Sequence, residues 1–306
     1  MEIIKSGTTI DFMGRRRAGF IISGILIIAG IVSLIAHGGP NYGIDFAGGT
    51  LIQVRLSEPV SPAEIRQGLT DVGLTGTVQH FGGEGAGEYL IRLQTTSSDL
   101  EGLSAQIHDA LAERFGEETF EIRRTEMVGP KVGKDLRTKG LQAIIFALIG
   151  ILIYISWRFK FRFAVGAVAA LAHDVLITIG VFSLTNKEFS LPVLAALLTI
   201  VGYSLNDTIV VYDRIRENMG RMRREIFERT VNISVNETLS RTILTSGTTL
   251  IVVLVLFLMG GGVIHDFTFA LLIGVIVGTY SSIFVASPLV VMWQKRFPAK
   301  GEKRRT

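Results

Sequence analysis

Six long apolar stretches set the strongest limit on how this chain can fold. A helix of roughly 20 apolar residues crosses the ~30 Å hydrocarbon core of a bilayer, and each stretch is close to that length. Four of the six contain no Asp, Glu, Lys, Arg or His. We therefore predict an α-helical polytopic membrane protein with six transmembrane helices, at residues 18–36, 141–157, 163–184, 189–212, 242–264 and 267–294.

The first stretch has a second interpretation, as a secretory signal. Three arginines at 15–17 precede it, and a basic segment also precedes the apolar core of a signal peptide. The stretch at 18–36 is longer than the roughly 7–15 residues of a signal core, and no Ala-x-Ala site follows it. We expect a retained anchor, with residues 1–17 as an N-terminal arm.

Basic residues gather on one side of the predicted membrane helices. Segments 1–17, 158–162, 213–241 and 295–306 together hold 20 Lys and Arg residues, whereas the short loops opposite hold Lys187 and little else. Since such residues favour the cytoplasmic side, we predict that both termini are cytoplasmic and that 295–306 is a basic tail. The arginines within 214–224 suggest either nucleic-acid binding or contact with anionic lipids. We expect membrane lipids and no nucleic acid.

Residues 37–138 form a polar segment on the opposite, extracytoplasmic side. Strand patterns occur at 50–56, 77–81, 89–93 and 119–127, and the last two strands before the second helix are joined by a glycine-rich loop at 82–87. Helices are expected from Ser61 to about Val72 and from Asp99 to Gly116. The order β-α-β-β-α-β predicts an α+β ferredoxin-like head domain, which implies no catalysis by itself. Residues 128–139 are expected to be a hinge leading back to the membrane helices at 139–294.

Three ionisable residues interrupt the predicted membrane helices. A charged side chain at the centre of such a helix costs about 2.5–3.5 kcal/mol, so it usually has a function or a partner. Asp207 is either a proton site, alternating between charged and protonated forms, or a static interhelical contact such as an ion pair with Arg214. His173 and Asp174 point about 100° apart on a helix, so we expect one to meet the fourth helix and the other solvent or a partner. They form either a relay or a polar clamp.

Glycines mark two further places in the sequence. Gly48 and Gly49 predict a tight turn with positive φ rather than a phosphate cradle, because no lysine follows in P-loop spacing. Gly274, Gly278 and Ser282 form a stripe of small residues on the sixth helix. Such a stripe favours close helix packing, either within this chain or against a partner.

Several motifs resemble those of bacterial SecD/SecF protein-export subunits. The sequence GIDFAGG at 43–49 is similar to the head-domain signature of that family and includes Gly43, Asp45, Phe46, Gly48 and Gly49. Four further motifs resemble the SecF branch specifically: AHDV at 172–175, GYSLNDT at 202–208, DRIRE at 213–217, and SRT at 240–242 with Thr245 and Ser246. The resemblance extends over essentially the whole chain.

This resemblance implies a function and a set of partners. A SecF-like subunit works with a SecD-like subunit beside the SecYEG channel in the bacterial inner membrane, and uses the proton-motive force to pull unfolded polypeptides outward. Its membrane part resembles half of a resistance-nodulation-division transporter. The family motif also implies a functional arginine at Arg241, which by position alone is one more basic residue at the membrane boundary. The predicted proton relay therefore comprises Asp207, Arg241, His173 and Asp174.

Other functions remain open at this point. One is export of lipids or small molecules by another transporter of the same superfamily, and another is a purely structural stabiliser of SecD. An intramembrane hydrolase would use Ser204, but Gly-x-Ser-Gly and His-Glu-x-x-His are absent and the chain has no cysteine. We expect no enzymatic activity, no metal and no cofactor.

Overall fold

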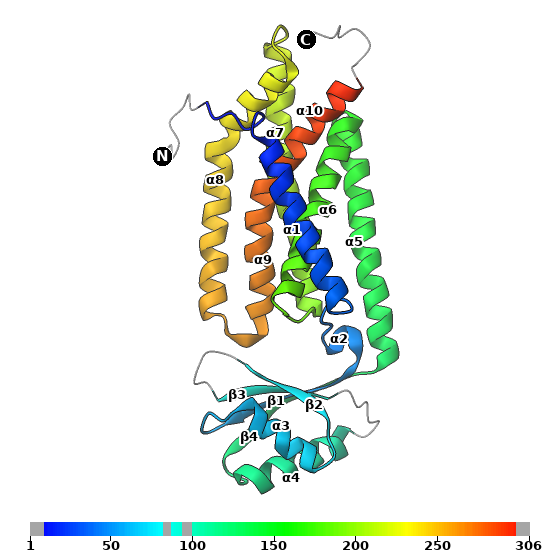
Figure 1. Ribbon diagram of the computed structural model, residues 1–306, viewed down its shortest axis with the longest axis vertical. Helices are drawn as coiled ribbons and strands as arrows, with labels where there is room; N and C mark the ends of the chain where they lie inside the picture. The colour runs from blue at the N-terminus through cyan, green and yellow to red at the C-terminus, as the bar shows by residue number, and fades with distance from the viewer. Residues whose placement is uncertain (1–8, 82–86, 94–99, 298–306) are drawn as a thin grey trace.

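The computed structural model describes residues 9–81, 87–93 and 100–297, which form a helical bundle with a smaller α/β head at one end (Figure 1). Within these residues six helices are long and apolar enough to cross a membrane, which confirms the predicted number of spans. They are α1 (Arg16–Ala36), α5 (Pro130–Arg158), α6 (Phe161–Leu184), α7 (Leu191–Arg221), α8 (Phe227–Met259) and the continuous run Ile264–Arg296. The basic arm before residue 9, the tail after residue 297, the loop at 82–86 and the Asp99 cap lie outside the described residues.

The head domain has the predicted ferredoxin-like fold. Its elements are β1 (Gly49–Leu56), α3 (Pro62–Asp71), β2 (Gly76–His80), β3 (Glu88–Leu93), α4 (Leu100–Phe115) and β4 (Phe120–Val128). The four strands pair antiparallel in the order β2-β3-β1-β4. The side chains of alternate strand residues pack against α3 and α4 in one apolar core, which includes Ile52, Val54, Ile65, Leu69, Ile91, Ile107 and Leu111.

Local sequence signals explain the borders of the head helices. Ser61 caps α3 by accepting a hydrogen bond from the Ala63 amide, and Pro62 occupies the first helical position. Gly73 and Gly116 follow α3 and α4 with φ of 77° and 94°, a conformation that favours glycine. A short helix, α2 (Ile44–Ala47), precedes β1 and was not predicted.

The predicted hinge at 128–139 is wrong for most of its length. Gly129 caps α5, Pro130 begins it, and the helix continues without interruption to Arg158. Gly129, Pro130 and Gly133 suggested a break. A proline at the first helical position does not disturb a helix, because an amide there would have no partner within the helix. Gly133 lies within this helix and allows it to pack on the motif at 43–49, because a Cβ atom there would lie 3.0–3.1 Å from the backbone of Phe46 and Gly48.

The boundary predicted between the fifth and sixth spans is also displaced. Helix α8 ends at Met259 rather than at residue 264, and α9 (Gly261–Ser281) follows Gly260 directly. Apolar residues continue through this turn, so hydropathy alone could not locate it. The last span is not one regular helix either, because the π-helical segment η1 (Ser282–Ala286) separates α9 from α10 (Ser287–Arg296). Pro288 lies just after it and donates no backbone hydrogen bond.

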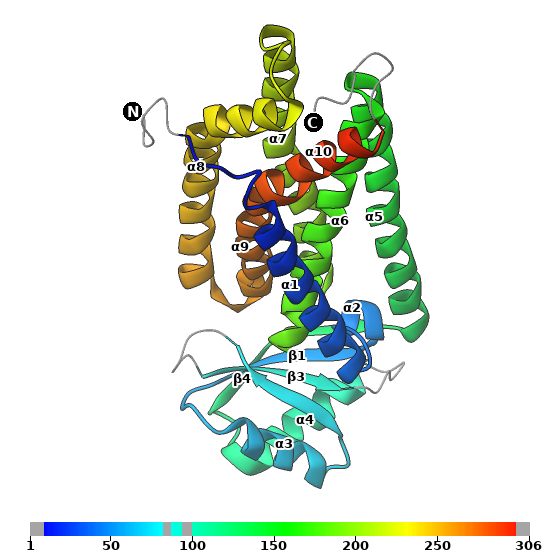
Figure 2. The ribbon, with the colours of Figure 1, turned by 45° about the horizontal axis from the view of Figure 1, so that its top comes forward.

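Helices α6, α7 and the sixth span form the centre of the bundle, and α1, α5 and α8 lie around them. Helix α1 crosses α6 obliquely, with the start of α1 and the end of α10 far from the head (Figure 1, Figure 2). The outer helices expose large apolar side chains such as Ile35, Phe146 and Leu258. This pattern is expected for helices whose outer faces contact lipid or other membrane helices.

Candidate functional site

Asp207 lies on α7 inside the bundle and is 3% exposed. Its Oδ2 accepts a hydrogen bond from Ser246 Oγ of α8 at 3.2 Å. Ser246 Oγ in turn accepts a hydrogen bond from Thr279 Oγ1 of α9 at 2.7 Å. Two hydroxyl groups from two further helices therefore lead to the buried carboxyl group.

Two arginines were candidate partners of Asp207. Arg214 instead pairs with Glu217 at 2.9 Å and lies 3.5 Å from Glu237, so the expected alternative of a static Arg214–Asp207 pair is wrong. Arg241 is exposed on α8, five residues before Ser246. Its charge acts on Asp207, but no hydrogen bond or ion pair joins the two among the described residues.

His173 and Asp174 lie at the centre of a second buried cluster. His173 Nδ1 and Asp174 Oδ1 are hydrogen bonded at 2.9 Å, and His173 Nε2 bonds to Ser23 Oγ of α1, also at 2.9 Å. Asp174 Oδ2 accepts hydrogen bonds from Ser204 of α7 at 2.6 Å and Ser281 of α9 at 2.8 Å. One of the two residues does meet the fourth span, as expected, but the other faces α1 rather than solvent or a partner. Because α6 lies at the centre of the bundle, both His173 and Asp174 find hydrogen-bond partners on neighbouring helices of the same chain.

The serines of this cluster were missed by sequence reasoning. Ser23 and Ser281 lie in otherwise apolar segments and look like ordinary small residues. Ser204 was noticed only as a possible nucleophile, whereas in the structure its hydroxyl donates to Asp174. The sequence does offer one signal, which is the presence of serine residues in membrane helices when another helix carries an acid. A buried acid needs hydrogen-bond donors from the protein, because no water is available there.

Two other hydroxyl groups close to Asp207 in the sequence have no hydrogen-bond partner among the described residues. Tyr203 Oη and Thr208 Oγ1 are buried on α7, and neither makes a hydrogen bond with any residue that the structure describes. Tyr203 lies one turn before Asp207 and Thr208 directly follows it. The segment around Asp207 therefore combines a bonded carboxyl group with two unsatisfied hydroxyls.

Glycines allow the helices that carry these groups to approach closely. A Cβ atom at Gly274 would lie 2.2 Å from Ile200 Cγ1, and one at Gly278 would lie 2.9 Å from Ser204 Cβ. These two members of the small-residue stripe thus face α7 of the same chain. Ser282 begins η1, and its hydroxyl donates to the Thr279 carbonyl at the end of α9 rather than to another span. Gly30 and Gly180, which the sequence analysis did not single out, meet where α1 crosses α6.

The GIDFAGG motif connects the head to the membrane helices. Gly43 N donates to Phe189 O at 2.9 Å, and Asp45 Oδ2 accepts from the Leu191 amide, the first residue of α7, also at 2.9 Å. Phe46 is buried with its ring centroid 5.7 Å from that of Phe189. We call residues 43–49 and the loop 185–190 the collar.

The double glycine of the motif makes the predicted turn. Gly48 and Gly49 have φ of 80° and 126°, and they direct the chain into β1. A Cβ atom at Gly48 would lie 2.8 Å from Pro130 Cα, so the start of α5 packs directly on this turn. The chain enters the head through residues 43–49 and leaves it at the start of α5, so both connections between the head and the membrane bundle lie at the collar.

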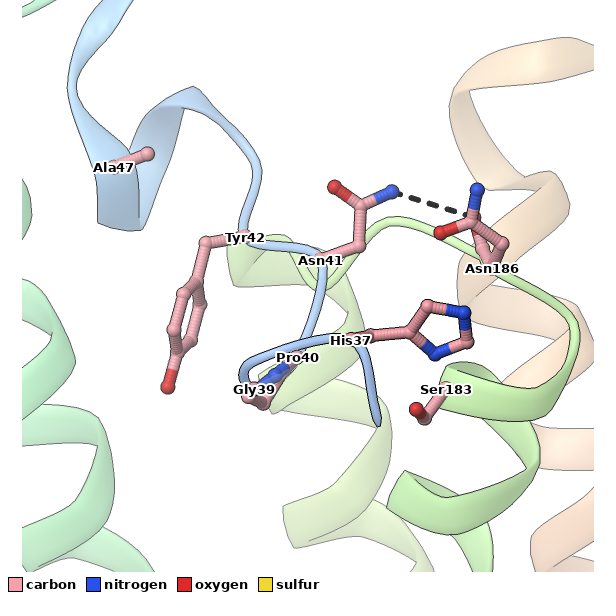
Figure 3. A pocket seen from close by; sticks show the side chains of 8 residues that line it. All are labelled: His37, Gly39, Pro40, Asn41, Tyr42, Ala47, Ser183 and Asn186. Atoms are coloured by element: carbon pink, nitrogen blue, oxygen red, sulfur yellow. Dashed lines mark hydrogen bonds between the residues drawn. The ribbon is translucent and has the colours of Figure 1, made fainter. Parts of the chain in front are cut away.

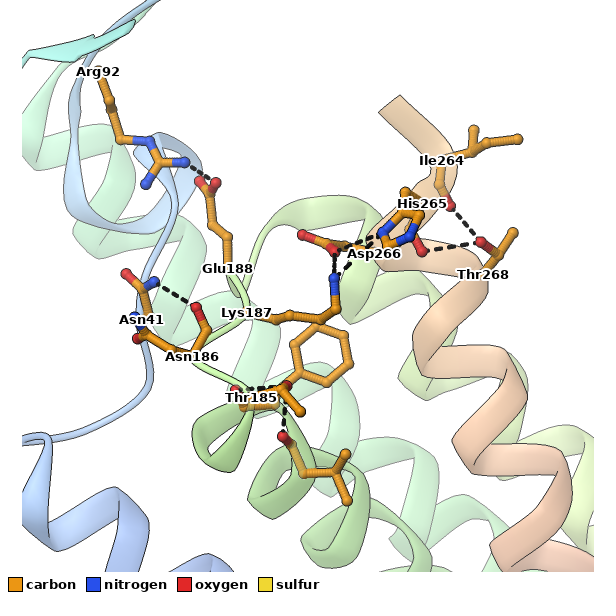
Figure 4. A network of polar contacts seen from close by, with 12 residues as sticks. Asn41, Arg92, Thr185, Asn186, Lys187, Glu188, Ile264, His265, Asp266 and Thr268 are labelled. Carbon is orange, nitrogen blue, oxygen red and sulfur yellow. Dashed lines mark hydrogen bonds and ion pairs between the residues drawn. The ribbon is translucent and has the colours of Figure 1, made fainter. Parts of the chain in front are cut away.

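Ion pairs extend the collar on the head side of the bundle (Figure 4). Arg92 of β3 pairs with Glu188, and Lys187 pairs with Asp266 of α9 at 2.7 Å. Burial lowers the pKa of Arg92 from its ordinary value, and the negative charge of Asp266 opposes that effect. Because a buried guanidinium needs a charged partner, the Arg92–Glu188 pair fixes β3 to the loop between α6 and α7.

A cavity of about 360 Å³ lies beside the collar (Figure 3). The loop after α1 contributes His37 and Asn41, and the end of α6 with the following loop contributes Ser183 and Asn186. Asn41 Nδ2 donates to the Asn186 carbonyl across it at 3.3 Å. The cavity carries no ion pair or acidic cluster of its own among the described residues.

Comparison with known proteins gives the family. The model described as protein export membrane protein SecD/SecF, C-terminal, matches residues 107–296, which is more than half of the chain. The chain belongs to the SecD/SecF family. A second model, the SecD/SecF GG motif, matches residues 33–60 and so includes the double glycine of the collar.

The SecD/SecF relatives include proteins named protein translocase subunit SecF. One from Magnetococcus marinus is 52% identical over 95% of this chain and 94% of its own length. Others from Vibrio alginolyticus and Escherichia coli O157:H7 are 49% and 43% identical, over 95% and 92% of this chain and 91% and 87% of their own lengths. The family assignment makes this chain a membrane subunit of Sec protein export, of the SecF type.

Solved structures of SecDF share the fold. The crystal structure of SecDF, a translocon-associated membrane protein from Thermus thermophilus, has a TM-score of 0.86 and 38% identity over 95% of this chain. A structure of SecDF in a super-membrane-facing form has a TM-score of 0.69 at the same identity and covers 98% of this chain. This chain spans 39% and 40% of the lengths of those two solved chains.

Proposed function

We propose that this subunit uses the proton-motive force, together with a SecD-like subunit, to promote movement of unfolded polypeptides through SecYEG across the bacterial inner membrane. The observation that carries the proposal is Asp207, an acid buried among three helices of a membrane bundle. Its bonding partner is a neutral hydroxyl, and a cation, Arg241, lies on the same helix as that hydroxyl. This arrangement suits a carboxyl group that gains and loses a proton.

The energy available at such a site is sufficient to bias a conformational change. One proton crossing the field releases about 2.3 kcal/mol per 100 mV, which changes a two-state equilibrium by nearly two decades. To use that energy, Asp207 alternates between a charged form, which the charge of Arg241 attracts, and a protonated form, which it does not attract. The collar, which joins the start of α7 to the head through Asp45, gives movement of α7 a direct route to the head.

His173 and Asp174 are proposed as further members of the relay. Their cluster reaches α7 at Ser204, one turn from Asp207, and α9 at Ser281, two residues from Thr279. The competing role is that of a polar clamp, in which the cluster only holds α1, α6, α7 and α9 together. The two roles differ in outcome, because a clamp affects assembly and stability while a relay affects proton movement in an assembled protein.

A SecD-like partner is supported by an exposed face of α7. Thr199, Gly202 and Asn206 lie on that face and are exposed, although they belong to a membrane-spanning segment. Small and polar residues on a membrane helix favour close contact with another helix over contact with lipid tails. The solved SecDF chains, which are more than twice as long as this one, are consistent with a second bundle against this face.

The proposed orientation places the head outside the cytoplasm. Basic residues such as Arg158, Arg216 and Arg224 lie at the end of the bundle that is far from the head. Basic residues favour the cytoplasmic side of a membrane protein. The hairpin between α7 and α8 projects furthest at that end (Figure 2). Its arginines are proposed to contact anionic membrane lipids.

Substitutions at Asp207 and Arg241 test the proposal. Asp207→Asn mimics the protonated form permanently, so the variant is expected to assemble with its partner yet lose export that depends on the proton-motive force. Arg241→Met is expected to be as inactive, and Arg241→Lys partly defective, because lysine keeps the charge but loses the planar fork that holds a carboxylate. Export is measured in cells, and proton flux in vesicles that contain the SecD-like partner.

Two results separate the alternatives. If Asp207→Asn exports and conducts protons like the wild type, the residue is a static hydrogen-bonding group and the chain is better described as a stabiliser of SecD. If proton flux depends on Asp207 but polypeptide export does not, the chain belongs functionally with exporters of lipids or small molecules.

A further inference from the structure

Ser246 occupies the central position in a chain of hydrogen bonds that ends at Asp207. Its hydroxyl donates to Asp207 Oδ2 at 3.2 Å and accepts from Thr279 Oγ1 at 2.7 Å. Thr279 Oγ1 also lies 2.7 Å from the Val275 carbonyl of its own helix. Four groups from α7, α8 and α9 are therefore linked in series.

This series suits both protonation states of the carboxyl group. When Asp207 is charged, Thr279 donates to Ser246 and Ser246 donates to the carboxylate. When Asp207 is protonated, the chain can run in the opposite direction, from the carboxyl hydroxyl to Ser246, then to Thr279, then to the Val275 carbonyl. A hydroxyl group can reverse roles in this way because it is both donor and acceptor.

The position of Thr279 is itself fixed by its neighbours in α9. Tyr280 Oη donates to the Gly19 carbonyl of α1 at 2.6 Å, and Ser281 donates to Asp174 of α6. Three consecutive residues, 279–281, thus bond to three different helices immediately before the π-helical segment η1. π-helical turns occur frequently at functional sites, and here the turn follows the residues that define the rotation of α9.

Few charged groups face Asp207 from the helices packed against it. Arg241 of α8 acts on it through its charge. The described part of α9 contributes two neutral side chains near Asp207, Thr279 and Tyr280. Helix α6 contributes the His173–Asp174 pair, which is hydrogen bonded to Ser204, one turn before Asp207 on α7. Ser246 is the group that contacts the carboxyl oxygen directly.

We propose that Ser246, held by Thr279, is a positioning residue that keeps the Asp207 carboxyl group in place in both of its protonation states. The inference deepens the proposed proton site and rests on it for its functional meaning. Ser246 neither binds nor releases the transported proton in this scheme. Its hydroxyl sets how readily Asp207 does so.

The test measures the protonation of Asp207 itself. Dicyclohexylcarbodiimide reacts with protonated carboxyl groups in membranes, so its labelling of Asp207 across a pH series reports the midpoint of protonation. The intact subunit is used in native membranes or as co-purified with its partner. Trypsin cleavage at Lys187 and Arg214 places Asp207 in a different peptide from Asp174, so mass spectrometry reads the two acids separately.

Ser246→Ala removes a hydrogen bond that is stronger to the charged than to the protonated carboxyl group, so the labelling midpoint is expected to move to higher pH by about one unit. Ser246→Thr, which restores the hydroxyl, is expected to return the midpoint toward that of the wild type. The matched control is Thr248→Ala on the same helix, because that hydroxyl is exposed and bonds only to carbonyls of α8. The control is expected to titrate like the wild type.

A second variant keeps the test decisive if Ser246→Ala does not assemble. Thr279→Val leaves Ser246 in place but removes the group that holds it, so a smaller shift in the same direction is expected. Its control is Thr268→Val, since Thr268 is buried on α9 and bonds only to its own helix.

An unchanged midpoint in Ser246→Ala, or an equal shift in Thr248→Ala, would overturn the inference. Neither result bears on the proposed function, which fails only if Asp207→Asn exports like the wild type.

Discussion

The crossing of α1 and α6 offers a sharp test of the packing. Gly30 and Gly180 face each other there, and a Cβ atom at Gly30 would lie 2.7 Å from Gly180 Cα. Ordinary carbon contacts begin at 3.4 Å, so Gly30→Ala forces the two backbones apart by about 0.7 Å. Neither partner can avoid this by changing a rotamer, because the clash is with backbone.

The cost can be separated from the intrinsic preference of alanine for helices. Overpacking of this kind costs about 1–3 kcal/mol, while replacement of a helical glycine by alanine gains up to about 1 kcal/mol. Gly24→Ala on the same helix gives the second effect alone, since nothing lies within 4 Å of its Cβ position. We therefore expect Gly30→Ala to be about 1–3 kcal/mol less stable than Gly24→Ala.

Disulfide cross-linking reads the helix separation directly. Ser33 and Ser183 lie one turn from the crossing with their hydroxyl oxygens 2.8 Å apart, and the chain has no native cysteine. Paired Ser33→Cys and Ser183→Cys substitutions should form a disulfide readily with a mild oxidant, and should do so more slowly when Gly30→Ala is added. Thermal unfolding in detergent gives the stability difference. Equal cross-linking and equal unfolding temperatures for the Gly30→Ala and Gly24→Ala backgrounds would refute the reasoning.

Three further predictions concern single polar groups. Asp45→Ala removes the group that caps the Leu191 amide at the start of α7, so it should destabilise the protein by about 1 kcal/mol, while Asp45→Asn retains the acceptor and should cost less. Ser204→Ala leaves Asp174 short of a donor and should cost about 1.5–3 kcal/mol, because hydrogen bonds to charged groups are the strong ones. Tyr203→Phe and Thr208→Val remove hydroxyls that make no bond with the described residues, so both should be neutral or slightly stabilising. Thermal unfolding measures all five variants, and a loss in Thr208→Val as large as that in Ser204→Ala would contradict the assignment of these contacts.

Features that depend on neighbouring residues in the sequence were predictable. The six spans follow from long apolar runs, which must be helical because lipid offers no hydrogen bonds to the backbone. The ferredoxin-like order of the head follows from alternating strand patterns and from local signals such as Ser61 and Gly73. Asp207 stood out for the same reason, since a charged residue in an apolar run is conspicuous without any knowledge of its surroundings.

The tertiary structure decided which groups meet. Arg214 is two helical turns from Asp207 on the same helix, about 10.5 Å further along its axis. It bonds to Glu217 and lies against Glu237 of α8, because those carboxylates are within its reach. Ser246 and Thr279, which serve Asp207 instead, are 39 and 72 residues distant, and nothing in their own segments indicates that they converge. The π-helical segment at 282–286 was likewise hidden, because apolar residues continue through it. The turn at Gly260 did have a local signal, the three glycines at 260–262, which hydropathy alone passes over.

The physical reason for this division is the range of the forces involved. Hydropathy and helix or strand periodicity act between residues a few positions apart, and they fix which segments cross the membrane and which form the head. Contacts among hydroxyl, carboxyl and glycine positions depend instead on the rotation and separation of packed helices, which glycine pairs such as Gly30 and Gly180 set to within less than an ångström. The sequence thus determined where the buried acids lie, and only the packed bundle determined which hydroxyl groups hold them.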